Sequence, residues 1–329
     1  MTNPLDTLTG KGLLIHHWDT DGITSAALML QYLKDHQITT LTPTLGNYFL
    51  TEKELRETQA YDYIIVCDMA LPHSNLDILS ADKQLLIFDH HLQEKHQKAL
   101  LHHNPIIDGE DPDDYPSASW IVNSYLHNPA TLYSLLGVIG DHECSINENP
   151  LFKAHIQTLQ ETHKFSFQDL LTMVYLLDSN YKIGDKKAVE QAPYQLNNHS
   201  EDPNFILNNN QWKKNNDSIT QELATQLDNI PKPQDGVIIK TMNNSYNLIS
   251  TITRKIYWKT HHHTIVINTG YFPDHDQLYA RSTKDLEPMI QLGKQIGFNC
   301  GGKKQVLGAI IPKHQTQDYI TQLTNYLKN

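Results

Sequence analysis

The stretch LLIHHWDTDG, residues 13–22, decides the fold, because a short apolar run in it leads directly into two acids. Three further apolar runs end in the same way: Ile64–Val66 before Asp68, Leu85–Phe88 before Asp89, and Leu135–Ile139 before Asp141. Runs of this length, separated by helix-like stretches, are typical of strands in a mostly parallel sheet. Such sheets bind ligands at the carboxyl edge of their strands, so we expect the acids to converge at one edge.

Length, charge and cysteine content limit the class of protein. With 329 residues and 39% hydrophobic content, the chain can form two packed domains. A formal net charge of -11 opposes the binding of long DNA or RNA and favours a small or short anionic substrate whose charge cations offset. The three cysteines are widely spaced, which indicates reduced thiols in the cytosol. No apolar stretch approaches the ~20 residues that span a bilayer, and the first residues lack the regions of a secretion signal. We therefore expect a soluble, cytoplasmic protein without membrane contact.

The pattern along the chain predicts an α/β protein with a mostly parallel-sheet N-terminal domain and a smaller α/β C-terminal domain. The first is expected over residues 1–190, where Phe167–Leu177 forms a buried closing helix. Residues 191–235 are expected to be a linker and connecting helix, because the Asn-rich stretch 191–216 favours turns and cannot build much core. The second domain is expected over 236–329. Its pattern is strand 237–240, helix 248–258, strands 264–268 and 277–281, helix 286–296, strand 306–311 and a terminal helix.

The segment HHWDTDG, residues 16–22, places one imidazole and two carboxylates within reach of a small volume. His17, Asp19 and Asp21 alternate, so at a strand end they share a face or fan out in the following turn. Gly22 permits a tight turn there. An ordinary turn with solvated aspartates is the alternative, since Asp and Gly favour turns for local reasons.

The segment FDHH, residues 88–91, supplies a nitrogen ligand, a neighbouring donor for substrate, and a carboxylate that can orient an imidazole. The histidines at 102–103 and 261–263 favour surface loops instead. Asp68 and Asp141 add carboxylates, although either alone is explained by capping of a following helix. Acids this crowded would repel one another strongly, so the pattern makes sense mainly if divalent cations sit between them. Oxygen and imidazole ligands suit Mn²⁺ or Mg²⁺ better than a thiolate zinc site.

The order HxDxDG, a lone Asp, DHH and GD resembles the four motifs of the DHH phosphoesterase superfamily over residues 13–143. That superfamily includes RecJ-type exonucleases, short-oligonucleotide nucleases, cyclic-dinucleotide phosphodiesterases and manganese pyrophosphatases. The C-terminal part resembles the substrate-binding domain associated with the family. Its glycine-rich signature corresponds to Gly301, Gly302 and Lys303, and its RS element to Arg281 and Ser282. The signature histidine is replaced by Lys303, with Lys304 beside it; lysine can pair with phosphate but cannot act as a neutral imidazole.

The resemblance implies two divalent cations, Mn²⁺ or Mg²⁺, that act together on a phosphate ester. One would be held by His17, Asp19 and Asp68, and the other by Asp21, Asp68, His90 and Asp141. His91 would contact the scissile phosphate and Asp89 would orient the histidines. The substrate would be held by Arg281, Ser282, Gly301, Gly302, Lys303 and Lys304.

By the same resemblance we expect a hydrolase of short oligonucleotides, an exonuclease or nanoRNase-like phosphodiesterase that also accepts pAp. A KKQ string keeps a manganese inorganic pyrophosphatase as an alternative, but the first motif is HxDxDG rather than the HxxPDxDS form of that branch. A cyclic-dinucleotide phosphodiesterase, or a non-catalytic scaffold that binds nucleic acid or a replication partner, are further alternatives. The sequence does not determine the oligomeric state, and a homodimer is one alternative.

Overall fold

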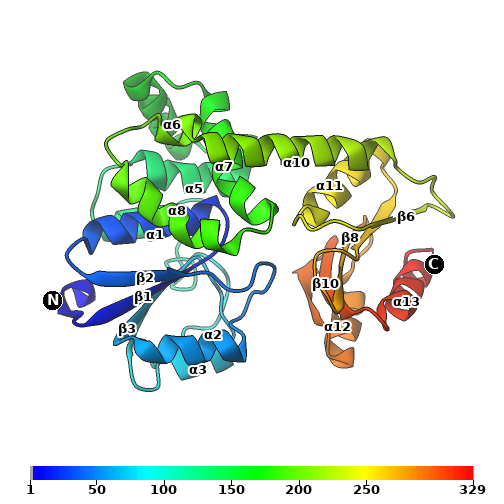
Figure 1. Ribbon diagram of the computed structural model, residues 1–329, viewed down its shortest axis with the longest axis horizontal. Coiled ribbons are helices and arrows are strands. Elements are labelled where there is room, and N and C mark those ends of the chain that lie inside the picture. Colours follow the sequence, from blue (N-terminus) through cyan, green and yellow to red (C-terminus); the bar gives the residue numbers. More distant parts are fainter. Residues whose placement is uncertain (1–2, 329) are drawn as a thin grey trace. The chain divides into compact units, whose positions relative to one another are not determined.

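The structure is a computed structural model that describes residues 3–328 and divides into two units (Figure 1). Unit 1 consists of the residues up to Tyr181 together with Asp185–Asn216. Unit 2 consists of Lys182–Gly184 and the residues from Asp217 onward. The predicted α/β class with two sheets is confirmed.

Unit 1 is built on a five-stranded sheet with the strand order β2-β1-β3-β4-β5, in which every pairing is parallel. The strands are β1 (Lys11–His16), β2 (Gln37–Leu41), β3 (Tyr63–Cys67), β4 (Gln84–Phe88) and β5 (Leu101–His103). Strands β1, β3 and β4 carry the predicted apolar runs and are almost entirely buried. The order reverses between β1 and β3, and the carboxyl ends at such a reversal form the usual ligand crevice of this sheet type.

Helices cover both faces of this sheet. The helices of unit 1 are α1 (Thr20–Tyr32), α2 (Glu52–Glu57), α3 (His73–Leu79), α4 (Ala118–Tyr125), α5 (Leu132–His142), α6 (Pro150–His163), α7 (Phe167–Lys182), α8 (Lys186–Asn198), α9 (Phe205–Asn208) and the first part of α10 (Asn210–Asp228). Figure 1 shows α1, α5 and α8 on one side of the sheet and α2 and α3 on the other. A parallel sheet covered on both faces explains why its strands read as continuous apolar runs.

The run Leu135–Ile139, expected as a strand, is instead part of helix α5. A capping box formed by Thr131 and Ser134 starts the helix, and the apolar run is buried among α1 and α4. Short apolar runs fit a buried helix as well as a buried strand, because burial on all sides removes the periodicity that distinguishes them. Asp141 therefore extends from the last turn of a helix, whereas Asp68 and Asp89 follow strands.

The Asn-rich stretch 191–216, expected as a linker, is largely helical within α8, α9 and α10. Val189, Ala192 and Leu196 are buried along α8, and Trp212 is buried on α10. The apolar residues between the asparagines recur with the period of a helix. For predicting structure here, this period is a stronger signal than the Asn-rich composition. The expected closing helix at Phe167–Leu177 is confirmed as part of α7.

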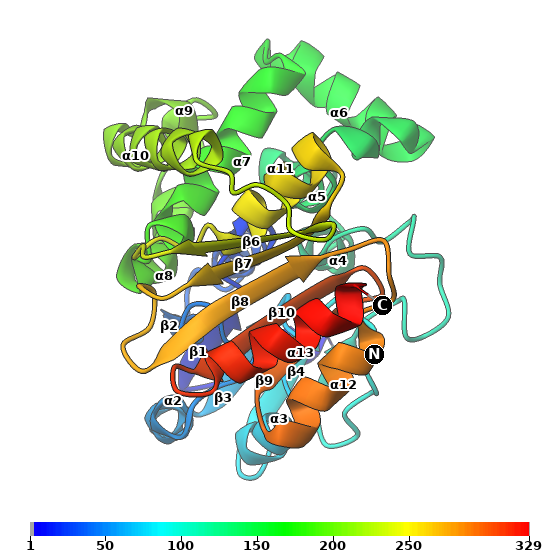
Figure 2. The same cartoon turned by 90° about the vertical axis from the view of Figure 1, so that its right-hand side faces the viewer.

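Unit 2 has a mixed sheet with the order β6-β7-β8-β10-β9. Its strands are β6 (Val237–Met242), β7 (His263–Asn268), β8 (His275–Arg281), β9 (Asn299–Lys303) and β10 (Val306–Pro312), and its helices are the end of α10, α11 (Ile249–Thr260), α12 (Glu287–Ile296) and α13 (Thr316–Lys328). Figure 2 shows α12 and α13 on one face of this sheet. Every expected element is present. Strand β9 was not expected, because the segment NCGGK has low strand propensity.

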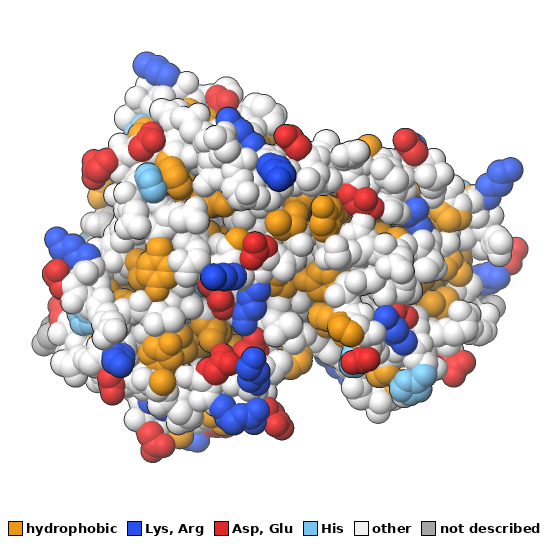
Figure 3. Space-filling model, in the orientation of Figure 1, with side chains coloured by type: hydrophobic (Ala, Val, Ile, Leu, Met, Phe, Trp, Pro, Cys, Tyr) orange, Lys and Arg blue, Asp and Glu red, His pale blue; other side chains and the backbone are white. Residues whose placement is uncertain are grey.

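The surface shown in Figure 3 mixes basic and acidic side chains without a continuous basic area. This agrees with the formal net charge of -11. Between residues 3 and 328, no helix combines the length and the apolar character needed to cross a bilayer.

Candidate metal centre

The turn between β1 and α1 brings the first three predicted ligands together. His17 follows the last residue of β1, Asp19 caps α1 by accepting a hydrogen bond from the Gly22 N–H at 3.2 Å, and Asp21 lies in the first turn. A Cβ on Gly22 would lie 2.5 Å from the His17 carbonyl oxygen. Only glycine therefore allows the helix to begin so soon after the strand, which explains the glycine of the HxDxDG pattern.

His17, Asp19 and Asp68 form one group whose ligand atoms lie within 4.8 Å of one another. His17 Nδ1 is 2.7 Å from Asp19 Oδ2 and 3.7 Å from Asp68 Oδ2. Asp68 follows β3 with φ of 60°, in the left-handed region that Asp tolerates better than most residues. This conformation turns the residue out of the strand at the edge where the group assembles.

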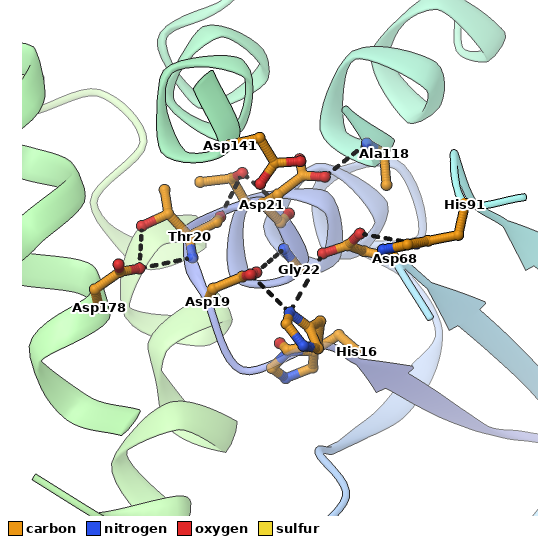
Figure 4. A network of polar contacts seen from close by, with 12 residues as sticks. His16, Asp19, Thr20, Asp21, Gly22, Asp68, His91, Ala118, Asp141 and Asp178 are labelled. Carbon is orange, nitrogen blue, oxygen red and sulfur yellow. Dashed lines mark hydrogen bonds and ion pairs between the residues drawn. The ribbon is translucent and has the colours of Figure 1, made fainter. Parts of the chain in front are cut away.

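Asp21, His90 and Asp141 form a second group, whose ligand atoms also lie within 4.8 Å of one another. His90 Nε2 lies 3.4 Å from Asp141 Oδ2. Asp21 is fully buried, and its carboxylate accepts hydrogen bonds from the Ala118 N–H at 2.6 Å and the Ser119 N–H at 2.9 Å (Figure 4). These donors belong to the start of α4, where helical N–H groups favour an anion.

Asp68 also approaches the second group, because His90 Nε2 lies 3.3 Å from Asp68 Oδ1. One carboxylate thus faces His17 with one oxygen and His90 with the other. Burial, together with the negative charges of Asp21, Asp19, Asp141 and Asp89, raises the pKa of Asp68 well above its ordinary value. For Asp19, burial alone would raise the pKa, but the neighbouring His17 outweighs it and lowers the pKa.

Asp89 holds His91 beside this centre. Its buried carboxylate accepts a hydrogen bond from His91 Nδ1 at 2.8 Å and one from the Gln93 side-chain amide at 2.7 Å. Burial would lower the pKa of His91, but the hydrogen bond to Asp89 and the surrounding carboxylates raise it. The His91 side chain is 47% exposed and lies 3.9 Å from Asp68 Oδ1, so it can meet a ligand at the centre.

His16, the first histidine of the motif, stays outside the site. It is fully buried, its Nδ1 lies 2.7 Å from the His17 carbonyl oxygen, and burial lowers its pKa to about 4. His16 is therefore a neutral core residue. His102, expected on a surface loop, is buried in β5, where its Nδ1 accepts a hydrogen bond from the His96 N–H. Strand β5 has only three residues, two of them histidines, so its sequence carries no recognisable strand pattern.

Two supporting residues could not be found from local sequence. Asp178 on α7 accepts hydrogen bonds from the Thr20 N–H at 3.0 Å and the Thr20 hydroxyl at 2.7 Å, and so anchors the residue between Asp19 and Asp21 (Figure 4). Gly137 on α5 packs against Asp21: a Cβ there would lie 2.2 Å from Asp21 Oδ1 and 2.0 Å from Ser119 Oγ. The Asp178–Thr20 and Gly137–Asp21 contacts each join segments more than a hundred residues apart.

The predicted substrate-binding residues gather within unit 2. Arg281 ends β8 opposite Val306, which in turn pairs with Lys303 of β9. Gly302 has φ of 152°, and a Cβ there would lie 2.0 Å from the Val306 carbonyl oxygen, so the β9–β10 turn requires glycine. Lys303 and Lys304 are exposed at this turn, next to the partly buried Gly301.

Ser282 does not fit a direct substrate contact. Its side chain is fully buried, lies 2.8 Å from His263 Nδ1 and accepts a hydrogen bond from the Lys284 N–H. The hydroxyl is therefore engaged inside unit 2. His263, expected on a surface loop, is the first residue of β7. Arg281 lies over Tyr257 and Trp258, with 5.7 Å from Cζ to each ring centroid.

The donor set fits divalent cations. Carboxylate oxygens and imidazole nitrogens converge in three overlapping groups, of which the third is Asp68, His90 and His91. His17 Nδ1, the nitrogen that faces Asp19 and Asp68, is buried and makes no hydrogen bond in the described part of the chain. A metal ion would satisfy that nitrogen and relieve the repulsion that raises the pKa of Asp68.

Comparisons with known proteins show what the chain is similar to. Residues 13–136 match the DHH family, N-terminal domain. No curated protein sequence matches the chain. A RecJ from Thermus thermophilus in complex with Mn²⁺ superposes with a TM-score of 0.69 at 14% identity, covering 96% of this chain and 52% of that one. The chain thus spans about half the length of that RecJ.

Two further solved structures share the fold over most of both chains. The DHH domain of a protein described as a member of a ribosomal-protein family gives a TM-score of 0.71 at 13% identity, with 97% of this chain and 87% of that one covered. A pGpG-specific phosphodiesterase from Vibrio cholerae gives 0.52 at 13% identity, with 97% and 99% covered. The family match identifies a DHH-type N-terminal domain at residues 13–136, and the solved structures share the fold of the chain.

Replacing Gly137 by alanine should disturb the second group of ligands without weakening the helix. Alanine is the better helix former, but its methyl group would displace the Asp21 carboxylate or Ser119. We expect affinity for Mn²⁺ to fall by roughly 10- to 100-fold at one of two sites, measured by calorimetric titration. Gly140→Ala is the matched control, because its Cβ would meet Thr20 Cβ at 3.2 Å and no ligand oxygen. Equal affinities in the two variants would contradict this role for Gly137.

The raised pKa of Asp68 should make the metal-free protein less stable as pH rises. Because the folded state holds this proton more tightly than the unfolded chain does, the stabilisation is complete below the ordinary pKa of Asp and is lost as pH rises through the folded pKa. Asp68→Asn should therefore gain stability relative to wild type as pH rises from the ordinary pKa of Asp toward the folded pKa, by about 1.4 kcal/mol for each pH unit in that interval. Urea unfolding in chelator measures this difference. The exposed Asp82→Asn serves as control, and a pH-independent difference for Asp68→Asn would disprove the assignment.

Proposed function

We propose that this protein is a two-metal phosphodiesterase that hydrolyses short oligonucleotides. The observation that carries the proposal is the position of Asp68 between two groups of acids and histidines, facing His17 at 3.7 Å and His90 at 3.3 Å. A carboxylate shared in this way is suited to bridge a pair of cations. Paired cations are a recurrent solution for displacement at phosphorus.

The cation sites are proposed as His17, Asp19 and Asp68 for one ion, and Asp21, Asp68, His90 and Asp141 for the other. Two divalent cations bound there would polarise a phosphoryl oxygen and lower the pKa of a water. Mn²⁺ is proposed because the donors mix oxygen and nitrogen, and because the T. thermophilus RecJ of the same fold was solved with Mn²⁺. Mg²⁺ is the second choice, since that RecJ was also solved with Mg²⁺.

His91 is proposed to hold the phosphate that is attacked. Its Nδ1 is held by Asp89, so the ring has a set orientation and its Nε2 is left for the substrate. In the metal-free protein the pKa of His91 is raised above its ordinary value, which favours the protonated ring relative to a free imidazole, and in that form both nitrogens donate. A cationic donor at this position would neutralise charge on a phosphoryl oxygen. Asp89 acts through His91 as a positioning residue.

Unit 2 is proposed to bind phosphate groups through its own cationic side chains. Arg281, Lys303 and Lys304 lie near one another along β8 and the β9–β10 turn. Lysine binds phosphate as a point charge and arginine binds it bidentately. Ser282 is left out of this set, because its hydroxyl is buried against His263.

A short, linear substrate fits better than the other candidates. The formal net charge of -11 disfavours long nucleic acid. The pGpG-specific phosphodiesterase of V. cholerae matches over 99% of its own length, and pGpG is a linear dinucleotide. A non-catalytic scaffold would have no need of a complete ligand set, so hydrolysis is the better explanation of these residues.

A substrate panel with Mn²⁺ tests this function. We expect 5′-phosphorylated oligonucleotides of two to five residues to be hydrolysed faster than pyrophosphate, a cyclic dinucleotide or oligonucleotides of ten residues. Asp68→Asn should lower kcat by at least about 100-fold, because a bridging ligand is lost. The matched control is Asp77→Asn, whose carboxylate is paired with Lys98 on the surface of α3.

Metal content is measured on the same samples. Two Mn²⁺ per wild-type chain, falling in Asp68→Asn but not in Asp77→Asn, would link the loss of activity to the centre. Pyrophosphate turned over faster than every oligonucleotide, or full activity in Asp68→Asn, would refute the proposal.

A further inference from the structure

An aromatic cluster borders the metal centre beside His17. The His17 ring centroid lies 4.2 Å from that of Trp18 and 5.9 Å from that of Tyr48, and the His17 and Tyr48 rings are stacked at 23°. Trp18 is only 5% exposed, whereas Tyr48 is 62% exposed. Trp18 thus supports the cluster from within the fold, and Tyr48 presents an aromatic surface beside a predicted metal ligand.

The loop that carries Tyr48 is held at both ends. It connects β2 to α2, and Leu45 and Leu50 on either side of Tyr48 are buried. The Leu50 N–H donates to the Asn75 side-chain oxygen at 2.7 Å, and the Thr44 hydroxyl donates to Glu54 at 3.0 Å. An exposed ring on an anchored loop loses little freedom on binding, which favours a role in recognition over a chance exposure.

The chemistry of this surface points to a nucleobase. A phosphate gains nothing from a tyrosine face next to several carboxylates, whereas every nucleobase has a π-face that stacks on aromatic side chains without regard to sequence. A base joined through its sugar to a phosphate at the metal centre would lie within one nucleotide of His17, which is where Tyr48 stands.

We infer that Tyr48 forms a stacking subsite for the base of the nucleotide whose phosphate occupies the metal centre. This inference rests on the proposed function and extends it, because it makes the base, and not only the phosphate, part of what the site recognises. Substrates without a base, such as pyrophosphate, would gain nothing from this residue.

Calorimetric binding of AMP and of ribose 5-phosphate to the Mn²⁺-loaded protein tests the subsite without requiring turnover. We expect wild type to bind AMP about tenfold more tightly than ribose 5-phosphate. Tyr48→Ala should remove this preference, and Tyr48→Phe should retain it because the ring remains. Tyr32→Ala is the matched control: this tyrosine is 40% exposed at the far end of α1, where its hydroxyl donates to Asp6.

Kinetics with a 5′-phosphorylated dinucleotide complete the test. Tyr48→Ala should raise KM by about tenfold while kcat changes little, since stacking contributes to binding rather than to the reacting atoms. An unchanged preference for AMP in Tyr48→Ala, or no preference in wild type, would overturn the subsite even if oligonucleotides are hydrolysed normally. If wild type hydrolyses no oligonucleotide but its preference for AMP depends on Tyr48, the proposed function fails and the subsite stands.

Discussion

The repulsion among five clustered carboxylates is the constraint on which unit 1 depends. Each acid needs a compensating partner, because unpaired charge is costly away from water. Asp21 receives two backbone N–H groups from α4, Asp19 pairs with His17 and the Gly22 N–H, and Asp89 receives His91 and Gln93. Asp68 lies among them all, and burial together with their negative charges raises its pKa. The remaining repulsion is what bound cations would relieve.

The fold makes this crowding sterically feasible. The strand order reverses between β1 and β3, so the loops after these strands diverge and leave room at the edge of the sheet. Glycine at positions 22 and 137 lets backbone and helix approach where a methyl group would strike His17 or Asp21. Helix α7 then fixes the first motif through the hydrogen bonds between Asp178 and Thr20. The site is thus held by contacts from several elements of unit 1.

The proposed function assigns different chemistry to the side chains of each unit. The acids and histidines of unit 1 are suited to cations and, through them, to a phosphate, and Tyr48 adds an apolar face for a base. The basic residues along β8 and β9 of unit 2 are suited to further phosphates. Under the proposed function, a chain of net charge -11 would attract a polyanion through bound cations and a few local side chains instead of through a basic surface.

The sequence by itself determined the three strands β1, β3 and β4, the α/β class of both units, and the acids and histidines that lie together at the candidate metal centre. It could do so because strands buried on both faces read as continuous apolar runs, and because parallel strands all end at the same edge. Only the tertiary structure decided that Asp141 arrives from helix α5, that 191–216 is helical, and that Ser282 is buried. The tertiary structure also showed that Asp178, Gly137 and Tyr48 lie beside the candidate metal centre. These features depend on which surface a segment packs against, and packing partners far apart in the chain leave no periodic trace in the local sequence.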